Sequence, residues 1–294
     1  LLGAEDRLVR EGGAYLKIVG LSAVPRVFYL VSLRGMGAAE DTVKPAIIGV
    51  STTLLNIFIT VVLVFGWIGL PKMGVTGAAV GTFTGNTLAG LSCLVLLNTN
   101  AYRLNLCRSG LGAWKRGWEI VRIGVPRIFT GGIVAAGRVP LHGILLWFGE
   151  AAVAAFQIGL RVLILAMMPN WGISAAAGTY TGQHLGKGEP EQAQEQGWIG
   201  VRLSLLISGP ITALLIFFRD SVAYLFIREQ PALDLAAQFI LIYGFVMIMY
   251  CFFKNLSGAL EGAGHTIVPM LAAGSGMAVL LVLSGIAAGP LDMS

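Results

Sequence analysis

Long apolar stretches alternate with short polar ones along this chain, and the apolar stretches have the length of membrane spans. A helix needs about 20 residues to cross roughly 30 Å of hydrocarbon. Charge-free runs of that size occur at residues 45–71, 73–102, 162–186 and 235–253. The pattern predicts eight helices, at residues 12–34, 45–67, 74–98, 119–148, 152–182, 196–218, 233–257 and 266–289. The expected fold class is therefore all-α, a polytopic membrane helical bundle.

The amino-acid composition also indicates that the chain lies in a lipid bilayer. Hydrophobic residues make up 56% of the 294 residues, charged residues make up 12%, and the mean hydropathy is +0.79. Such a chain cannot cover a water-facing surface of ordinary polarity. The net charge of +5 comes from basic residues between the predicted spans, where they favour contact with a lipid bilayer over contact with nucleic acid.

A short glycine phrase occurs twice and indicates an internal repeat. Arg34-Gly35-Met36-Gly37 precedes Pro45, and Glu261-Gly262-Ala263-Gly264 precedes Pro269. Glycine lets the backbone leave a helix, and proline suits the first turn of the next one. Each phrase therefore predicts a tight turn between two helices. The sequences upstream also correspond, with Gly20 and Gly244 similarly placed, and internal duplication is typical of membrane transporters.

The two phrases also predict how the chain is divided. They imply six helices per repeat, so that three helices are missing before Leu1 and one after Ser294. Because the chain starts on Leu1 rather than on methionine, we expect a fragment of a twelve-helix protein with two incomplete lobes. Residues 1–98 are expected to form the C-terminal half of a first lobe, with three helices. Residues 99–118 are expected to form a basic linker, and residues 119–294 a second lobe with five helices.

Charge sets the expected orientation of the chain in a cell (inner or plasma) membrane. The linker at residues 99–118 is the longest polar connection and has no acidic residue, but it carries Arg103, Arg108, Lys115 and Arg116. Short cationic loops stay in the cytoplasm. The linker is therefore predicted to be cytoplasmic.

Basic residues inside the spans are the first candidates for a functional site. An arginine at mid-bilayer costs about 2.5–3.5 kcal/mol on insertion scales, so it is expected to face protein or water. Arg138 lies deepest, with His142 one turn later on the same helix face. This pair either lines a cavity and senses a charge or a proton, or binds backbone carbonyls as a structural pair. The candidate substrate cavity comprises Arg26, Arg138, His142, Gln157, Arg161, Lys254 and Asn255.

Acidic residues are absent from the predicted spans. Every aspartate and glutamate lies in a loop or at the edge of a span. Cation coupling ordinarily needs a buried carboxylate or a ring of carbonyl oxygens, so these spans offer no obvious cation site. The sequence also has no HExxH or GxSxG motif and no cysteine spacing for a metal, and we expect neither an enzyme nor a cofactor.

The order of several sequence stretches resembles the multidrug and toxic compound extrusion (MATE) family. These stretches are the two glycine phrases, Leu55-Asn56 with Phe65-Gly66, residues 73–79, and the run from Pro169 to Gly186. The resemblance implies twelve helices in two six-helix lobes around a central cavity. It also implies export of organic compounds by alternating access, driven by inward flow of sodium ions or protons.

The resemblance also bears on the coupling ion. Some members carry buried acids on the seventh and tenth helices, where this chain has Arg138 and Lys254. Others use an aspartate on the first helix, which would lie before Leu1, with polar support from later helices. Asn56 and Thr82 match such supporting positions, and Thr60 stands where a second aspartate is often found. The alternative is that these residues hydrogen-bond a neighbouring helix.

Three functions follow as hypotheses. The first is a secondary antiporter that exports amphiphilic or cationic organic compounds and works as a monomer when full length. The second is a lipid-linked sugar flippase of the same superfamily, which Arg26, Arg127, Arg138 and Arg161 keep open because such a cavity must hold pyrophosphate. The third is a membrane enzyme that acts on lipids.

Overall fold

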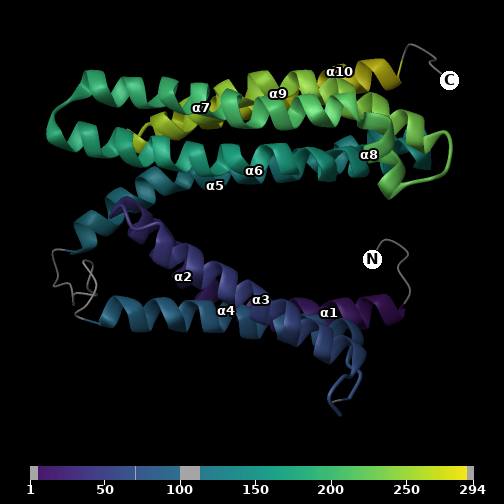
Figure 1. The fold of residues 1–294 in the computed structure, drawn as a ribbon, viewed down its shortest axis with the longest axis horizontal. Coiled ribbons are helices and arrows are strands. Elements are labelled where there is room, and N and C mark those ends of the chain that lie inside the picture. The colour runs from purple at the N-terminus through teal and green to yellow at the C-terminus, as the bar shows by residue number, and fades with distance from the viewer. Residues whose placement is uncertain (1–5, 70, 100–112, 290–294) are drawn as a thin grey trace. The chain divides into compact units, whose positions relative to one another are not determined.

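The computed structural model describes residues 6–69, 71–99 and 113–289. The chain forms two compact units, Leu1–Ser109 and Gly110–Ser294, and each is described by itself. Every regular element in the described ranges is a helix, which confirms the all-α prediction. Figure 1 labels these helices α1 to α10.

The described residues of the first unit form four helices, where three were predicted. They are α1 (Asp6–Leu21), α2 (Ala23–Ala38), α3 (Val43–Phe65) and α4 (Gly74–Asn98). The helix expected at residues 12–34 is a pair, α1 and α2, bent by 48° at Ser22. The buried Ser22 hydroxyl donates to the carbonyl of Val19 at 2.7 Å and accepts from the Asn86 amide at 2.9 Å. A serine that bonds the preceding turn competes with the helix ladder, which explains the break.

Glycines on α4 let it lie directly against α3. A Cβ added at Gly77 would come within 2.8 Å of the Leu63 carbonyl carbon, and one at Gly85 within 2.7 Å of the Asn56 amide nitrogen. Gly81 meets Thr60 in the same way. The three glycines recur every four residues and form the face of α4 that packs on α3.

Within residues 113–289, the second unit forms six helices, where five were predicted. They are α5 (Ala113–Trp147), α6 (Glu150–Lys187), α7 (Pro190–Phe217), α8 (Arg219–Phe226), α9 (Ala232–Gly262) and α10 (Ile267–Ala288). The short α8 was missed because eight residues are too few to show a periodic pattern, and its Arg219 and Asp220 resembled loop charges. Helix α5 also begins at Ala113, inside the predicted linker.

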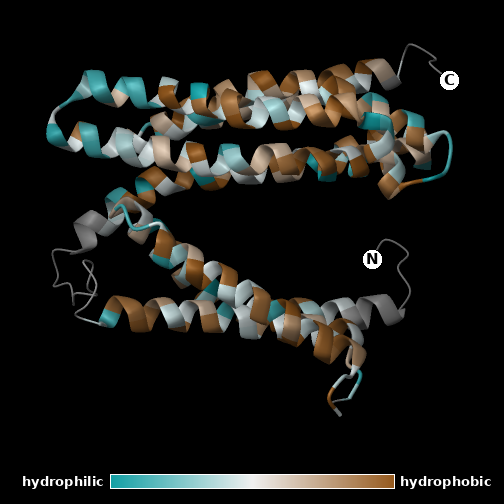
Figure 2. Cartoon of the chain, viewed as in Figure 1, coloured by the Kyte–Doolittle hydropathy of each residue, from teal (hydrophilic) through white to brown (hydrophobic). Residues whose placement is uncertain are grey.

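Seven of these helices are long and apolar enough to cross a membrane, and the bent pair α1–α2 would make eight. Figure 2 shows hydrophobic residues along the middle of the second unit and hydrophilic ones at the α6–α7 turn and between α8 and α9. This distribution is that of a multi-pass membrane protein, because apolar side chains face lipid and polar ones gather at its borders.

Helices α6, α7 and α9 form the packed centre of the second unit. A Cβ at Gly178 of α6 would come within 2.6 Å of the Gly258 carbonyl oxygen of α9, and one at Gly258 within 2.5 Å of the Ser174 carbonyl oxygen. Gly262 meets Gly178 even more closely. The two helix backbones therefore touch over more than one turn.

The two predicted glycine turns are not equivalent in the structure. Gly262 ends α9 and Gly264 takes the left-handed conformation (φ 83°), as expected. The first phrase is different, because Gly35 and Gly37 both lie inside α2 and the left-handed residue is Glu40 (φ 64°). The prediction of a turn at Gly35–Gly37 is thus wrong by about one helical turn.

The internal repeat is present in the structure, but its two copies align in a different register from the one that the glycine phrases predicted. The Asp41 backbone N–H donates to the Met36 carbonyl at 3.1 Å, and the His265 N–H donates to the Leu260 carbonyl at 2.8 Å. This bond closes the same six-residue turn in both copies, and each left-handed residue directly precedes its donor. Pro45 and Pro269 then occupy the same place and are both buried. In the second copy, Gly264 therefore corresponds to Glu40 of the first copy and not to Gly37.

Substitution of Gly258 by alanine tests the contact between α6 and α9. The added methyl group must displace Ser174, so we expect Gly258→Ala to lower the free energy of unfolding by about 1–3 kcal/mol. The measurement is thermal unfolding of the detergent-solubilised protein, followed by intrinsic fluorescence. The control is Gly172→Ala on α6, where no atom lies within 4 Å of the added Cβ and stability should hold or rise. Equal loss in both variants would contradict the contact.

Candidate functional site

The first unit brings two of its three predicted cation-supporting residues together. Asn56 of α3 donates its side-chain amide to the Gly81 carbonyl of α4 at 2.9 Å. Thr60 lies one turn further on the same face, and its buried hydroxyl has no hydrogen-bond partner among the described residues. Thr82 instead donates to the Ala78 carbonyl of its own helix at 3.0 Å. The contact between α3 and α4 thus holds one amide and one unpartnered hydroxyl, but no carboxylate in the described parts of either helix.

Arg26 lies on α2, four residues beyond the bend at Ser22, and its side chain is exposed. No ion pair of Arg26 is found within the described ranges. It belongs to the first unit, whereas the other cavity candidates belong to the second.

In the second unit, a hydrogen bond joins two of the predicted residues on different helices. The Nδ1 atom of His142 on α5 lies 2.7 Å from the Arg138 carbonyl oxygen, and its Nε2 atom contacts the amide nitrogen of Gln157 on α6. Because a carbonyl only accepts, Nδ1 must carry the proton. In the neutral ring Nε2 then accepts from Gln157. Both ring nitrogens of His142 are satisfied in this one tautomer.

Four of the predicted residues form a continuous surface, which we call the polar strip: Arg138 and His142 on α5, and Gln157 and Arg161 on α6. Each pair is spaced by four residues and so shares a helix face, and the bond between His142 and Gln157 joins the two faces. Both arginines are exposed, with no ion pair in the described structure. The sequence has no acidic residue between Glu119 and Glu150, or from there to the end of α6. The strip is therefore cationic.

Aromatic side chains continue from the polar strip onto α9. The His142 ring meets the edge of Phe156 at 5.7 Å between centroids, and Phe156 meets Phe239 at 5.4 Å. Phe239 stacks on Tyr243 at 4.7 Å. Edge-to-face and stacked rings at these distances add roughly 0.5–1.5 kcal/mol per pair beyond their burial. The strip is thus bordered by a row of rings suited to an amphiphilic compound.

Asn255 lies at the centre of a buried polar cluster instead of on a surface. Its side chain is 0% exposed, and its amide nitrogen lies 2.7 Å from the Ser204 hydroxyl, 2.8 Å from the Cys251 carbonyl and 3.3 Å from the Asn170 side-chain oxygen. Asn170 in turn donates to Ser208 at 2.9 Å. We call these residues of α6, α7 and α9 the asparagine cluster. Lys254 is half-buried beside it, and its carbonyl accepts from Ser174 at 2.8 Å.

Sequence reasoning missed most of the asparagine cluster. Asn170 is a single amide in an apolar span directly after Pro169, and that isolation was a usable signal. Ser204 and Ser208 are spaced by one turn on α7 and accept from α9 and α6 respectively, but serine is common in membrane helices and gave no signal in the sequence. The bond from the Trp171 indole to the Tyr250 hydroxyl, at 2.9 Å, had no signal in the sequence.

Arg127, counted earlier among the cationic candidates, is already neutralised. Its guanidinium lies 2.7 Å from the Glu261 carboxylate, which ties α5 to the end of α9. The two side chains are 54% and 16% exposed, so the pair adds about 0–1 kcal/mol of stability. No cluster of three or more histidine, cysteine or acidic residues that could hold a metal ion occurs among the described residues.

The fold and the polar strip define the class of protein: an all-helical, multi-pass membrane protein with polar side chains held inside its spans. The chain belongs to the MATE family of transporters, which is not an enzyme family, and the MatE family model matches residues 141–286. Relatives include a Thermotoga maritima protein named probable multidrug resistance protein NorM, 32% identical over 91% of this chain and 58% of that protein. A Bacillus subtilis protein named probable multidrug resistance protein YoeA is 24% identical over 92% of this chain and 59% of that protein.

Solved structures agree with this assignment at the level of the fold. A mutant MATE superposes with a TM-score of 0.87 at 20% identity, covering 99% of this chain and 65% of that one. A transporter of the MOP superfamily from Pyrococcus furiosus gives 0.86 at 20% identity, covering 98% and 65%. The chain spans about 58% of the length of the curated relatives it matches.

Removal of the central amide tests the asparagine cluster. We expect Asn255→Ala to lower the free energy of unfolding by about 2–4 kcal/mol, because it leaves Asn170 and Ser204 short of a donor in a buried site. Thermal unfolding measures the effect. The matched control is Asn98→Ala, at the exposed end of α4, which should be neutral. A stable Asn255→Ala variant would show that the cluster is not structural.

The tautomer of His142 is a second testable consequence. ¹⁵N NMR of the histidine-labelled protein should show that the neutral form of the His142 ring is protonated at Nδ1, because the Arg138 carbonyl requires a donor there. The exposed His265, whose ring has no partner among the described residues, serves as an internal reference and should favour the Nε2-protonated form of free imidazole. An Nε2-protonated His142 would contradict the bridge to Gln157.

Proposed function

We propose that this chain is part of a secondary transporter that exports small organic compounds across the cell membrane, and that the polar strip lines the route. The observation that carries the proposal is a set of four polar side chains inside two spans of a MATE fold, joined by a hydrogen bond between α5 and α6. Polar groups at this depth are costly unless they face a neighbouring helix or a water-filled path. The names of the curated relatives support drugs as the substrates.

Inward flow of protons or sodium ions is the proposed driving force. The hydroxyl of Thr60 and the amide of Asn56 supply neutral oxygens at the contact between α3 and α4, and His142 can exchange a proton within the polar strip. Bound ion and bound substrate would then favour opposite conformations of the carrier, which couples their movements. The segment at residues 99–118 would lie in the cytoplasm.

The charge of the polar strip supports a second candidate, a flippase for lipid-linked sugars. Arg138 and Arg161 are exposed, positive and free of acidic neighbours on α5 and α6, as binding of a pyrophosphate would require. For the Pyrococcus furiosus transporter, a reverse polarity of the binding pocket suggests a different function. In both candidates the two arginines select the charge of what is carried.

Efflux of two dyes tests the export proposal. Bacteria that lack their own drug exporters and express this protein from its gene are loaded with a fluorescent organic cation, such as ethidium, or with a fluorescent organic anion. Efflux should exceed that of empty cells and should collapse when the proton or the sodium gradient is dissipated. Arg161→Gln removes a positive charge from the polar strip, so it should shift the ratio of cation to anion efflux about tenfold toward the cation.

The matched control is Arg228→Gln, an exposed arginine outside the polar strip, which should leave the ratio unchanged. A ratio unaffected by Arg161→Gln would remove the strip from the route. If neither dye is exported and deletion of the gene causes loss of a cell-envelope glycan, the flippase hypothesis is favoured over the exporter hypothesis.

A further inference from the structure

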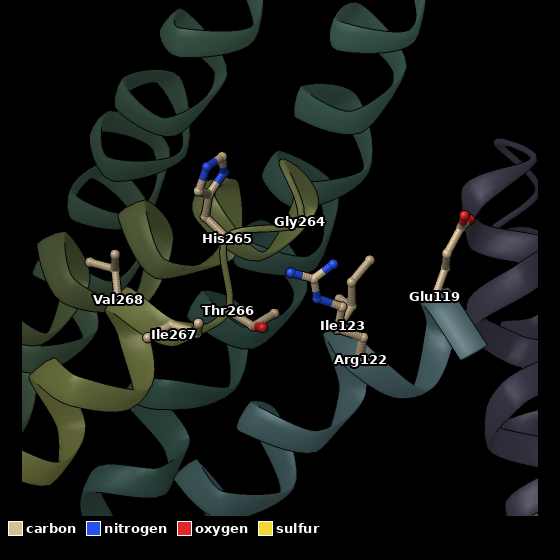
Figure 3. A pocket seen from close by; sticks show the side chains of 8 residues that line it. All are labelled: Glu119, Arg122, Ile123, Gly264, His265, Thr266, Ile267 and Val268. Carbon is tan, nitrogen blue, oxygen red and sulfur yellow. The ribbon is translucent and has the colours of Figure 1, made fainter. Parts of the chain in front are cut away.

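A pocket at one end of the second unit lies outside the polar strip and the asparagine cluster. It has a volume of about 420 Å³ and lies between the first turns of α5 and the start of α10. Its walls are Glu119, Arg122 and Ile123 from α5, and Gly264 to Val268 from the turn and α10. Figure 3 shows these side chains from close by. The volume is in the range of pockets that hold small ligands.

The buried wall of this pocket carries a hydroxyl without a partner. Thr266 is 5% exposed and immediately precedes α10, but its side chain does not cap that helix. Its hydroxyl makes no hydrogen bond to any described residue, and Figure 3 shows the oxygen directed toward α5. Because the residue is otherwise buried and its hydroxyl lines the pocket, the hydroxyl is available to a ligand bound there.

The first turn of α10 adds further donors beside Thr266. The backbone N–H groups of Ile267 and Val268 have no partner within the helix because they lie in its first turn, and Pro269 has no N–H to offer. Free amides at a helix amino-terminus favour a negative charge.

A positive side chain faces these donors and is not neutralised by the protein. In Figure 3 the guanidinium of Arg122 extends from α5 toward Gly264 and Thr266, whereas the carboxylate of Glu119 points away from them. Glu261, the nearest acid on α9, is already paired with Arg127. Arg122 makes no ion pair with a described residue. At this end of the pocket, an arginine, a hydroxyl and two backbone amides therefore face the same space, and the carboxylate of Glu119 is directed elsewhere.

We propose that Arg122, Thr266 and the amino-terminus of α10 bind the phosphate group of a phosphate ester, with the headgroup of an anionic phospholipid as the expected source. A guanidinium and helix amides together match the charge and the acceptors of phosphate. Ile123, Ile267 and Val268 provide apolar walls for the rest of the ester. Both spans begin within a few residues of this site, at Gly117 and Ile267, which places it at the level of lipid headgroups.

Native mass spectrometry of the purified protein in a non-ionic detergent tests the site. One arm adds phosphatidylglycerol and the other adds glycerol 3-phosphate, which has the phosphate without the acyl chains. We expect the wild-type protein to retain phosphatidylglycerol. Arg122→Gln should bind it about tenfold more weakly, and Thr266→Val, which keeps the shape of the side chain, about threefold more weakly.

Arg202→Gln is the control, because Arg202 is an exposed arginine of α7 that does not line the pocket, and its binding should equal that of the wild type. Binding of glycerol 3-phosphate that depends on Arg122 and Thr266 would support the same site with a soluble phosphate ester as its source. Equal binding by the wild type, Arg122→Gln and Thr266→Val in both arms would overturn the proposal.

Discussion

Close approach of helix backbones is the constraint on which the second unit depends. In a bilayer, helices gain little from burying apolar side chains against one another, so they associate through tight packing and a few polar bonds. Gly178 of α6 and Gly258 and Gly262 of α9 bring the two backbones into direct contact. Only at that separation can short side chains such as Ser174 and Asn170 reach across to α9. The asparagine cluster is thus a consequence of the glycines.

Close helix packing divides the polar side chains inside the spans into two sets: those held by hydrogen bonds between helices, and those exposed on the surface of the unit. Asn255 and Asn170 form side-chain hydrogen bonds with neighbouring helices, and these bonds hold α6, α7 and α9 together. The polar strip satisfies only its histidine and glutamine in this way, and its arginines extend from the surface. One set of intramembrane polar residues fixes the fold, and the other remains free to meet water, ions or a solute.

Helix number and position were largely predictable because span length and charge-free runs are local properties of the sequence. The bounds predicted for α4, residues 74–98, are those observed. The bend at Ser22 and the register of the repeat were not predictable, because they depend on bonds to distant residues and on which residue takes the left-handed conformation. The Ser22 hydroxyl needs Asn86, 64 positions away. Glu40 takes the role that Gly264 has in the second copy, although the nearby glycines were the stronger signal.

For the candidate site, sequence identified His142 and Gln157 as polar residues within spans but did not predict that they would bond each other. Their contact depends on the rotation of α5 relative to α6, which no local pattern encodes. Asn255 illustrates the opposite limit. It was selected for the same reason, an amide in an apolar span, and yet it lies in the packed centre of the unit. A polar residue at membrane depth is expected to be important. Its polarity alone does not show whether it stabilises the fold or lines the proposed transport route.

The arrangement of α5 has a mechanical consequence. Helix α5 packs chiefly along α10, where Gly137 receives Met277, whereas α6, α7 and α9 pack on one another. Side-chain bonds from α5 to that trio include the His142 contact to Gln157 and the Arg127 pair with Glu261, and its chain connection to α6 passes through the left-handed Gly149. Helices α5 and α10 thus form a pair that packs separately from α6, α7 and α9 within the second unit. A displacement of this pair would strain the histidine bridge, so in the proposed transporter a movement of the helices and a change along the polar strip would be coupled.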